Sequence, residues 1–156
     1  MRKIRPCLWF DTQAGEAAAF YTSIFKNSTI SHTTYYGESG PMPAGAVLVV
    51  EFEIDGQPLI ALNGGPAHTF NEAVSLQISC ETQEEVDQLW EKLSEGGIED
   101  QCGWLKDKYG LSWQVVPAML PTLLSDPDPE RAARAMKAML GMRKLDIAAL
   151  QAAADS

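Results

Sequence analysis

An internal repeat constrains the fold of this chain more than any other feature of its sequence. The tripeptide Asp11-Thr12-Gln13 returns as Glu81-Thr82-Gln83, an offset of 70 residues. A short strand-like segment precedes each copy, and an amphipathic stretch follows it, over residues 14–25 and 84–94. Apolar residues at helical spacing in both stretches predict a strand followed by a helix. The repeat therefore predicts two copies of one supersecondary unit.

Strand candidates follow each predicted helix. They are residues 28–36, 46–54 and 58–62 in the first half, then a short strand near Ile98 and a hairpin over 102–116 in the second. Each unit is therefore expected to be β-α-β-β-β. The expected fold class is α+β, with two fused units forming a curved mixed sheet with a cleft, plus a C-terminal helical tail.

Turn and capping residues predict where the elements begin and end. Asp55-Gly56 is a signal for a tight hairpin turn, because glycine takes positive φ without steric cost. Thr82 and Glu85 have the spacing of a capping box at the second predicted helix. In the tail, Gly141 is expected to end one helix and Asp146 to begin another. The paired units are expected over 1–117 (about 1–66 and 67–117), and the helical extension over 118–156.

The second hairpin carries two tryptophans. If Lys108 and Tyr109 form a two-residue turn, with Gly110 at positive φ, Trp104 lies directly across from Trp113 as a core anchor. Gln114 then points to the other face of the sheet. A turn one residue longer would alter the pairing of the tryptophans.

Composition excludes several classes of partner. The formal net charge of −9 and pI near 4.6 give no basic field for nucleic acid or a membrane surface. The three cysteines (Cys7, Cys80 and Cys102) form no C-x-x-C motif and are odd in number, which is typical of free thiols in the cytoplasm. No stretch is long enough to span a bilayer.

Several segments together resemble the PhnB-like branch of the vicinal oxygen chelate superfamily, whose members often carry the name 3-demethylubiquinone methyltransferase. The similar segments are WFDTQAGEAAAFYTSIF, ALNGGP, FNEAVSLQISCETQEEVDQLWEKL and CGWLKDKYGLSWQVVP. The resemblance covers about residues 4–117. It implies the paired β-α-β-β-β fold, a ligand site on the concave side of the sheet and two-fold pairing of chains.

Strand alternation predicts which side chains face that concave side. The set expected to lie under a helix is Ile4, Leu8 and Phe10 in one unit and Val74, Leu76, Ile78 and Cys80 in the other. The set expected on the concave side is Arg5, Cys7 and Trp9, then Ser75, Gln77 and Ser79. With residues of the last strands and the inter-unit loop, the predicted ligand-binding residues are Cys7, Trp9, Asn63, His68, Phe70, Ser75, Gln77 and Gln114.

The superfamily's usual metal site takes a His or carboxylate from the first and last strand of each unit. The corresponding segments here are IRPCLWF, PLIALNGG, AVSLQISC and LSWQVV, and none contains His, Asp or Glu. Asn63 and Gln114 are weak neutral ligands, so no metal and no other cofactor is expected. The glycine pairs Gly64-Gly65 and Gly96-Gly97 also lack the strand-to-helix position that a doubly wound methyltransferase needs.

These observations favour a small-molecule-binding protein that forms a homodimer and holds an organic ligand of unknown identity in a metal-free cleft. An enzyme is the alternative, either a glyoxalase- or dioxygenase-like one that recruits a cation through Asn63, Gln114 and the substrate, or the methyltransferase of the family name. His68 would be its candidate base. A purely structural dimerisation domain, its cleft filled by side chains, is a third possibility.

Overall fold

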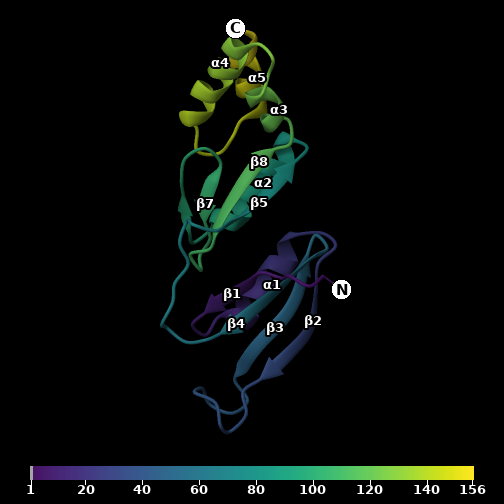
Figure 1. The fold of residues 1–156 in the computed structure, drawn as a ribbon, viewed down its shortest axis with the longest axis vertical. Helices are drawn as coiled ribbons and strands as arrows, with labels where there is room; N and C mark the ends of the chain where they lie inside the picture. Colours follow the sequence, from purple (N-terminus) through teal and green to yellow (C-terminus); the bar gives the residue numbers. More distant parts are fainter. Residues whose placement is uncertain (1) are drawn as a thin grey trace. The chain divides into compact units, whose positions relative to one another are not determined.

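A computed structural model describes residues 2–156 of the chain. It contains two compact units, one ending at Phe70 and the other beginning at Asn71 (Figure 1). Each unit has one four-stranded sheet. The α+β architecture of two similar units with C-terminal helices confirms the fold class predicted from the repeat.

The first unit is a sheet covered by one helix. Its elements are β1 (Cys7–Phe10), α1 (Ala14–Ile24), β2 (Thr29–Tyr35), β3 (Val47–Ile54) and β4 (Gln57–Asn63). The strand order is β1-β4-β3-β2, and β1 runs parallel to β4. Ala17 and Tyr21 of α1 are fully buried, as are Phe52 and Leu59 on the covered face of the sheet. The open face carries the alternate side chains of the same strands.

The hairpin between β3 and β4 follows the turn signal in the sequence. Ile54 pairs with Gln57, so only two residues form the loop. Asp55 and Gly56 both have positive φ, 48° and 74°. These are the dihedrals of a type I′ turn, whose twist matches that of the strands it joins.

The second unit repeats this arrangement and adds a helical tail. Its elements are β5 (Ser75–Cys80), α2 (Gln83–Ser94), β6 (Ile98–Glu99), β7 (Trp104–Lys106), β8 (Ser112–Pro117), α3 (Leu120–Leu124), α4 (Pro129–Leu140) and α5 (Ile147–Asp155). The strand order is β5-β8-β7-β6, and β5 runs parallel to β8. Each strand and helix of the first unit thus has a counterpart at the same place in the second.

Capping side chains fix the ends of the helices where the sequence predicts them. Thr82 Oγ1 accepts a hydrogen bond of 3.2 Å from the backbone N–H of Glu85, and the Glu85 carboxylate accepts one of 3.0 Å from Glu81 N–H. Asp146 accepts from Ala149 N–H at the start of α5. These bonds satisfy N–H groups that the first turn of a helix leaves unpaired.

The tryptophan pairing predicted for the second hairpin is wrong. Trp104 pairs with Gln114, and Leu105 pairs with Trp113. The backbone N–H of Asp107 bonds to Leu111 O over 2.9 Å, so three residues and not two form the loop. The extra residue shifts the register by one and places the two tryptophans on opposite faces of the sheet.

Two predicted face assignments also fail, at Ile4 and Val74. Both side chains are exposed, at 85% and 69%, because each precedes its strand and does not reach the helix. The faces predicted within the strands agree with the structure. Leu8 and Phe10 are buried, whereas Cys7 is exposed and Trp9 half-buried.

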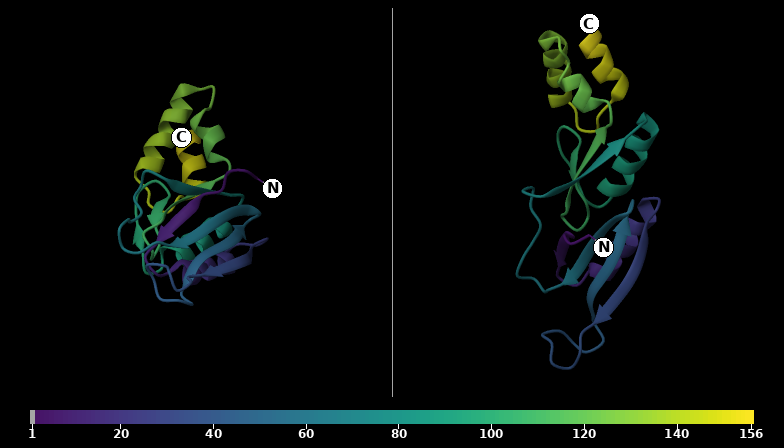
Figure 2. Two further views of the ribbon diagram at one scale, coloured as in Figure 1. Left: turned by 60° about the horizontal axis from the view of Figure 1, so that its bottom comes forward. Right: turned by 45° about the vertical axis from the view of Figure 1, so that its right-hand side comes forward.

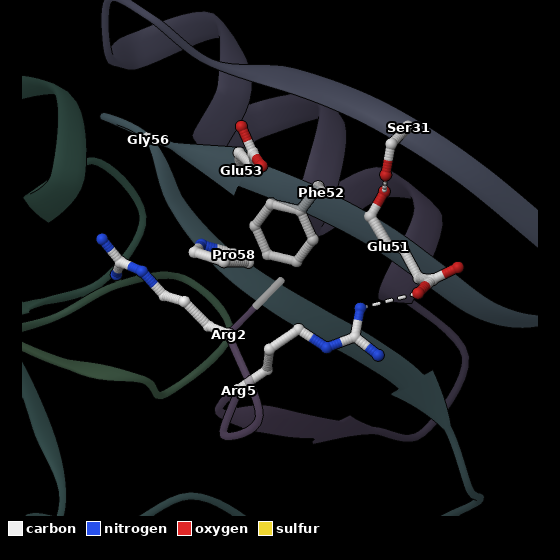
Figure 3. Close-up of a pocket in the computed structure, with 8 residues that line it drawn as sticks. All are labelled: Arg2, Arg5, Ser31, Glu51, Phe52, Glu53, Gly56 and Pro58. Carbon is white, nitrogen blue, oxygen red and sulfur yellow. Dashed lines mark hydrogen bonds and ion pairs between the residues drawn. The ribbon is translucent and has the colours of Figure 1, made fainter.

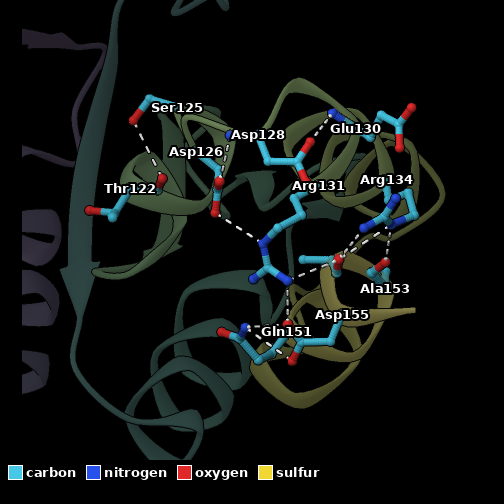
Figure 4. A network of polar contacts seen from close by, with 11 residues as sticks. Thr122, Ser125, Asp126, Asp128, Glu130, Arg131, Arg134, Gln151, Ala153 and Asp155 are labelled. Atoms are coloured by element: carbon cyan, nitrogen blue, oxygen red, sulfur yellow. Dashed lines mark hydrogen bonds and ion pairs between the residues drawn. The ribbon is translucent and has the colours of Figure 1, made fainter.

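The helices of the tail lie together at the C-terminal end of the chain (Figure 2), around an apolar cluster that also includes Val116 of β8. Its fully buried residues include Ala135, Leu145 and Leu150. Arg131 links the tail through ion pairs to Asp126 and Asp155 (Figure 4). Among residues 2–156, no helix combines the length and the apolar character needed to cross a bilayer.

Candidate functional site

Three predicted polar residues meet on the open face of the second unit. Gln77 of β5 pairs directly with Gln114 of β8. Ser75 precedes Gln77 by two residues on the same strand, so its side chain lies on the same face. Gln114 Nε2 donates a 2.8 Å hydrogen bond to Ser75 Oγ, and Gln77 Nε2 donates a 3.3 Å bond to Gln114 Oε1. We call these three residues the amide cluster. It presents neutral donors and acceptors beside a partly exposed sheet face.

Trp104 is a neighbour of the amide cluster that the sequence prediction missed. It lies across from Gln114 on β7 and is half-buried. Directly paired residues share a face of the sheet, so the indole is on the same side as the amides. The length of the loop could have predicted this position. Three residues between Asp107 and Leu111 set the register that pairs Trp104 with Gln114.

In the first unit, Trp9 and His68 form an aromatic pair. Their ring centroids are 4.8 Å apart and the rings are edge to face, at 77°. Trp9 Nε1 donates a 2.9 Å hydrogen bond to Gly65 O. A Cβ at Gly64 would overlap the Trp9 ring, so this position needs glycine for close approach. The loop after β4 therefore holds Trp9 in place and positions His68 beside it.

Phe70 does not join this pair. Its ring packs edge to face on Phe10, with centroids 5.2 Å apart. Phe10 is 3% exposed and belongs to the covered face of the first sheet. The structure thus separates Phe70 from Trp9, which alternation places on the open face of the same strand.

Asn63 is buried and its amide is used by the fold. Oδ1 accepts a 2.8 Å hydrogen bond from the backbone N–H of Ala14, and Nδ2 donates a 3.0 Å bond to Val47 O. The side chain of Gln13, at the N-cap position of α1, makes no capping bond, so Asn63 caps this helix from across the sheet. Sequence spacing gives no signal for such a contact, because 49 residues separate its two partners.

Cys7 lies on the open face opposite Ile60. Desolvation raises the pKa of the Cys7 thiol above its usual value of 9.0, so the sulfur is protonated at neutral pH. Burial raises the pKa of Cys80 further, to about 12. Neither thiol has the depressed pKa that marks a nucleophile or a metal ligand.

The metal site that the resemblance implies would take its ligands from the first and last strands of each unit. The first and last strands of each unit pair in parallel, and the repeat maps the Cys7–Ile60 pair onto the Gln77–Gln114 pair. The pair in the first unit offers a protonated thiol and an aliphatic chain, and the pair in the second unit offers two neutral amides. A divalent cation prefers carboxylate, imidazole or thiolate ligands, so these residues do not fit a metal. Nowhere in residues 2–156 do three or more His, Cys, Asp or Glu side chains cluster as a metal site.

Within residues 2–156, the turns from strand to helix differ from those that hold S-adenosylmethionine in a doubly wound methyltransferase. Such a site needs glycines in the turn from strand to helix and a parallel sheet. Asp11-Thr12-Gln13 joins β1 to α1, and Glu81-Thr82 joins β5 to α2, without glycine. Both sheets are mixed and have their first and last strands side by side.

A family model described as 3-demethylubiquinone-9 3-methyltransferase matches residues 2–116. Among solved structures, a putative 3-demethylubiquinone-9 3-methyltransferase, PhnB protein, from Bacillus cereus is 38% identical, with a TM-score of 0.70. The match covers 75% of this chain and 100% of that one. No curated protein matches the chain.

More distant structures share the fold alone. Protein PA1353 from Pseudomonas aeruginosa is 21% identical, with a TM-score of 0.61 over 75% of this chain and 98% of that one. The fosfomycin resistance protein FosX from Listeria monocytogenes, in complex with Mn(II) and sulfate, is 16% identical. Its TM-score is 0.54, over 80% of this chain and 98% of FosX.

Proposed function

The chain belongs to the family described as 3-demethylubiquinone-9 3-methyltransferase, the PhnB-like branch of the vicinal oxygen chelate superfamily, and we propose that it binds a small organic molecule without a resident metal. One observation carries this proposal: Gln77 and Gln114 of the amide cluster occupy strand positions where a metal-dependent relative would need His or carboxylate ligands. Hydrogen-bonded amides there suit recognition of a ligand's polar groups.

The amide cluster keeps spare hydrogen-bonding capacity for a ligand. Gln114 uses one N–H on Ser75 and accepts one bond from Gln77, while Gln77 Oε1 has no hydrogen bond to any residue from 2 to 156. Each amide can make four hydrogen bonds in all. Trp104 adds an apolar surface beside them. Apolar contact around a few oriented polar groups is the usual composition of a small-molecule site.

Trp9 and His68 support a second contact surface in the first unit. The Trp9 ring is half-buried and His68 is exposed, so part of the aromatic pair stays accessible. Planar or apolar ligands bind aromatic edges and faces favourably. The proposed ligand is therefore a small organic molecule with an apolar body and a few neutral polar groups.

We also propose a cytoplasmic homodimer. All three cysteines are free, which is typical of a reducing compartment. Ile30 and Tyr35 are exposed on β2, which lies at the edge of the first sheet. An edge strand with exposed apolar side chains is a surface that proteins commonly cover by association.

The first experiment is mass spectrometry of the native protein, to find a ligand that co-purifies. Its affinity is then measured for wild type, Gln114→Ala and Gln101→Ala. Gln101 is exposed and its side chain makes no hydrogen bond to residues 2–156, so it is a matched control. Gln114→Ala should weaken binding by roughly three- to tenfold, because it removes one or two neutral hydrogen bonds to the ligand. Gln101→Ala should leave the affinity unchanged. Equal affinity in all three proteins would contradict the proposal, and turnover of the ligand would favour the enzyme alternative.

A further inference from the structure

The first unit contains a pocket that the proposed function does not use. Its volume is about 570 Å³, within the range of small-molecule sites (Figure 3). It lies at the end of the sheet near the β3–β4 hairpin, and its lining includes Arg2, Arg5, Glu51 and Glu53. None of these residues belongs to the amide cluster.

The order of strands explains why these charges converge. Glu51 and Glu53 are two residues apart on β3 and therefore share a face. Glu53 pairs with Pro58 of β4, and Arg5 precedes β1, which pairs with the next part of β4. Arg5 thus reaches across β4 to Glu51, as the dashed contact in Figure 3 shows.

Arg5 has one edge of its guanidinium group occupied and another available. Its Nη1 donates a 2.6 Å hydrogen bond to Glu51, which lowers the pKa of that carboxyl. Its Nε and Nη2 have no hydrogen bond to residues 2–156. Together they form the planar fork that binds a carboxylate or phosphate oxyanion with two parallel bonds.

Arg2 and Glu53 bring two further charges to the pocket. Arg2 Nη1 donates a 2.8 Å bond to Gln57 Oε1, a neutral acceptor that leaves the positive charge uncompensated. Glu53 is half-buried and forms no ion pair within residues 2–156. The pocket thus has two arginines and two glutamates in its lining, which is a balanced set of charges in a chain whose net charge is −9.

This charge pattern decides the class of ligand. The two arginines and two glutamates cancel, so a simple anion gains no net attraction from them, and the rest of the chain repels it. A molecule with both charges can satisfy both kinds of group. We propose that this pocket binds a small zwitterion, with its carboxylate- or phosphate-type oxyanion on Arg2 and Arg5 and its ammonium group at Glu53.

Calorimetric titration of the full chain tests this proposal with defined probes. Phosphoethanolamine and β-alanine are zwitterions with the two kinds of oxyanion, inorganic phosphate carries only the negative charge, and ethanolamine only the positive one. At least one zwitterion should bind with a Kd below about 10 mM, and at least about tenfold more tightly than either single-charge probe. Binding of one zwitterion and not the other identifies the oxyanion and supports the proposal.

Variants that keep the fold locate the site. Arg5→Gln and Glu53→Gln should each weaken zwitterion binding by about tenfold, because each removes a charge-assisted contact. Lys26→Gln, an exposed change outside the pocket, and Gln114→Ala, in the amide cluster, should leave it unchanged. Circular dichroism checks that both variants fold without the half-buried Arg5–Glu51 pair or the Glu53 carboxylate. No binding of either zwitterion, equal binding of phosphate, or unchanged affinity in both pocket variants would overturn the proposal.

Discussion

The indole Nε1 of Trp113 donates a 2.9 Å hydrogen bond to Oδ2 of Asp107, and the two side chains are 1% and 2% exposed. The other carboxylate oxygen of Asp107 accepts from the backbone N–H groups of Tyr109 and Leu111, over 2.8 and 3.1 Å. A buried carboxylate is costly unless it is fully hydrogen-bonded. One side chain therefore shapes the loop and anchors the tryptophan that follows it.

Asp107→Ala is expected to lower the free energy of unfolding by about 2–4 kcal/mol, because it leaves three donors, two of them buried, without their acceptor. Urea denaturation followed by tryptophan fluorescence measures this. Glu91→Ala, on the exposed side of α2, is the control and should change stability by less than about 0.5 kcal/mol. Equal effects of the two substitutions would show that the hydrogen bonds of Asp107 contribute no net stability.

Gly110→Val should destabilise the fold by about 1–3 kcal/mol through backbone strain. Gly110 has φ of 88°, and a Cβ there would meet no atom within 4 Å, so steric clash does not contribute. Gly37→Val is the matched control, since Gly37 has equal space and no positive φ. Comparable unfolding midpoints for both variants would refute the turn assignment.

The ion pairs of Arg131 make the tail sensitive to acid. Hydrogen bonds from Asp128 N–H and Arg131 lower the pKa of Asp126, and those from Arg131 and Gln151 lower the pKa of Asp155, both from an ordinary 3.8. Because the folded pKa values are depressed, this stabilisation is complete above pH 3.8 and is lost as the pH falls further.

Arg131→Met should therefore lower the melting midpoint at about pH 7, and the difference from wild type should shrink towards about pH 2. Scanning calorimetry at both pH values provides the measurement. Arg143→Met removes an exposed arginine that forms no ion pair within residues 2–156 and controls for net charge. A difference from wild type that does not depend on pH would exclude the carboxylates as its source.

Protein purified without chelators should contain no stoichiometric zinc, nickel, iron or manganese by elemental analysis. A ligand that binds the native state raises the melting midpoint, so adding these ions should leave it unchanged. No metal is expected because the paired strands offer poor ligands: Ile60 has no ligating atom, and Gln77 and Gln114 are neutral. One tightly held metal per chain, lost together with an activity on chelation, would replace this proposal with the enzyme alternative.

Light scattering at a protein concentration of about tens of micromolar should give the mass of two chains. A stable dimer interface is saturated at about this concentration. The physical reason is the exposed apolar surface: Ile30 and Tyr35 on the edge strand β2, and Met136 and Leu140 on α4. Covering such surface on association is favourable. A monomer at this concentration would contradict the dimer.

The local architecture could be read from the sequence because its signals act over a few residues. Alternation predicted the faces of β1, Asp55-Gly56 predicted a two-residue hairpin, and Thr82, Gly141 and Asp146 marked helix ends. Alternation also placed Ser75 and Gln77 on one face of their strand, whereas Gln114 was assigned to that face from a hairpin register that the structure corrects, and its position across from Gln77 comes from the parallel pairing of β5 with β8. Each inference needed only a backbone period or one turn of chain.

Tertiary structure decided the contacts that join distant segments. The loop has one residue more than expected, so Trp104 pairs with Gln114 and not with Trp113. A shift of one residue in register turns every side chain of a strand to the other face. Asn63 became the cap of α1 across 49 residues, and Arg5 met Glu51 across 46. No local pattern encodes such contacts. They depend on which strands become neighbours, and that choice is made by the packing of the whole unit.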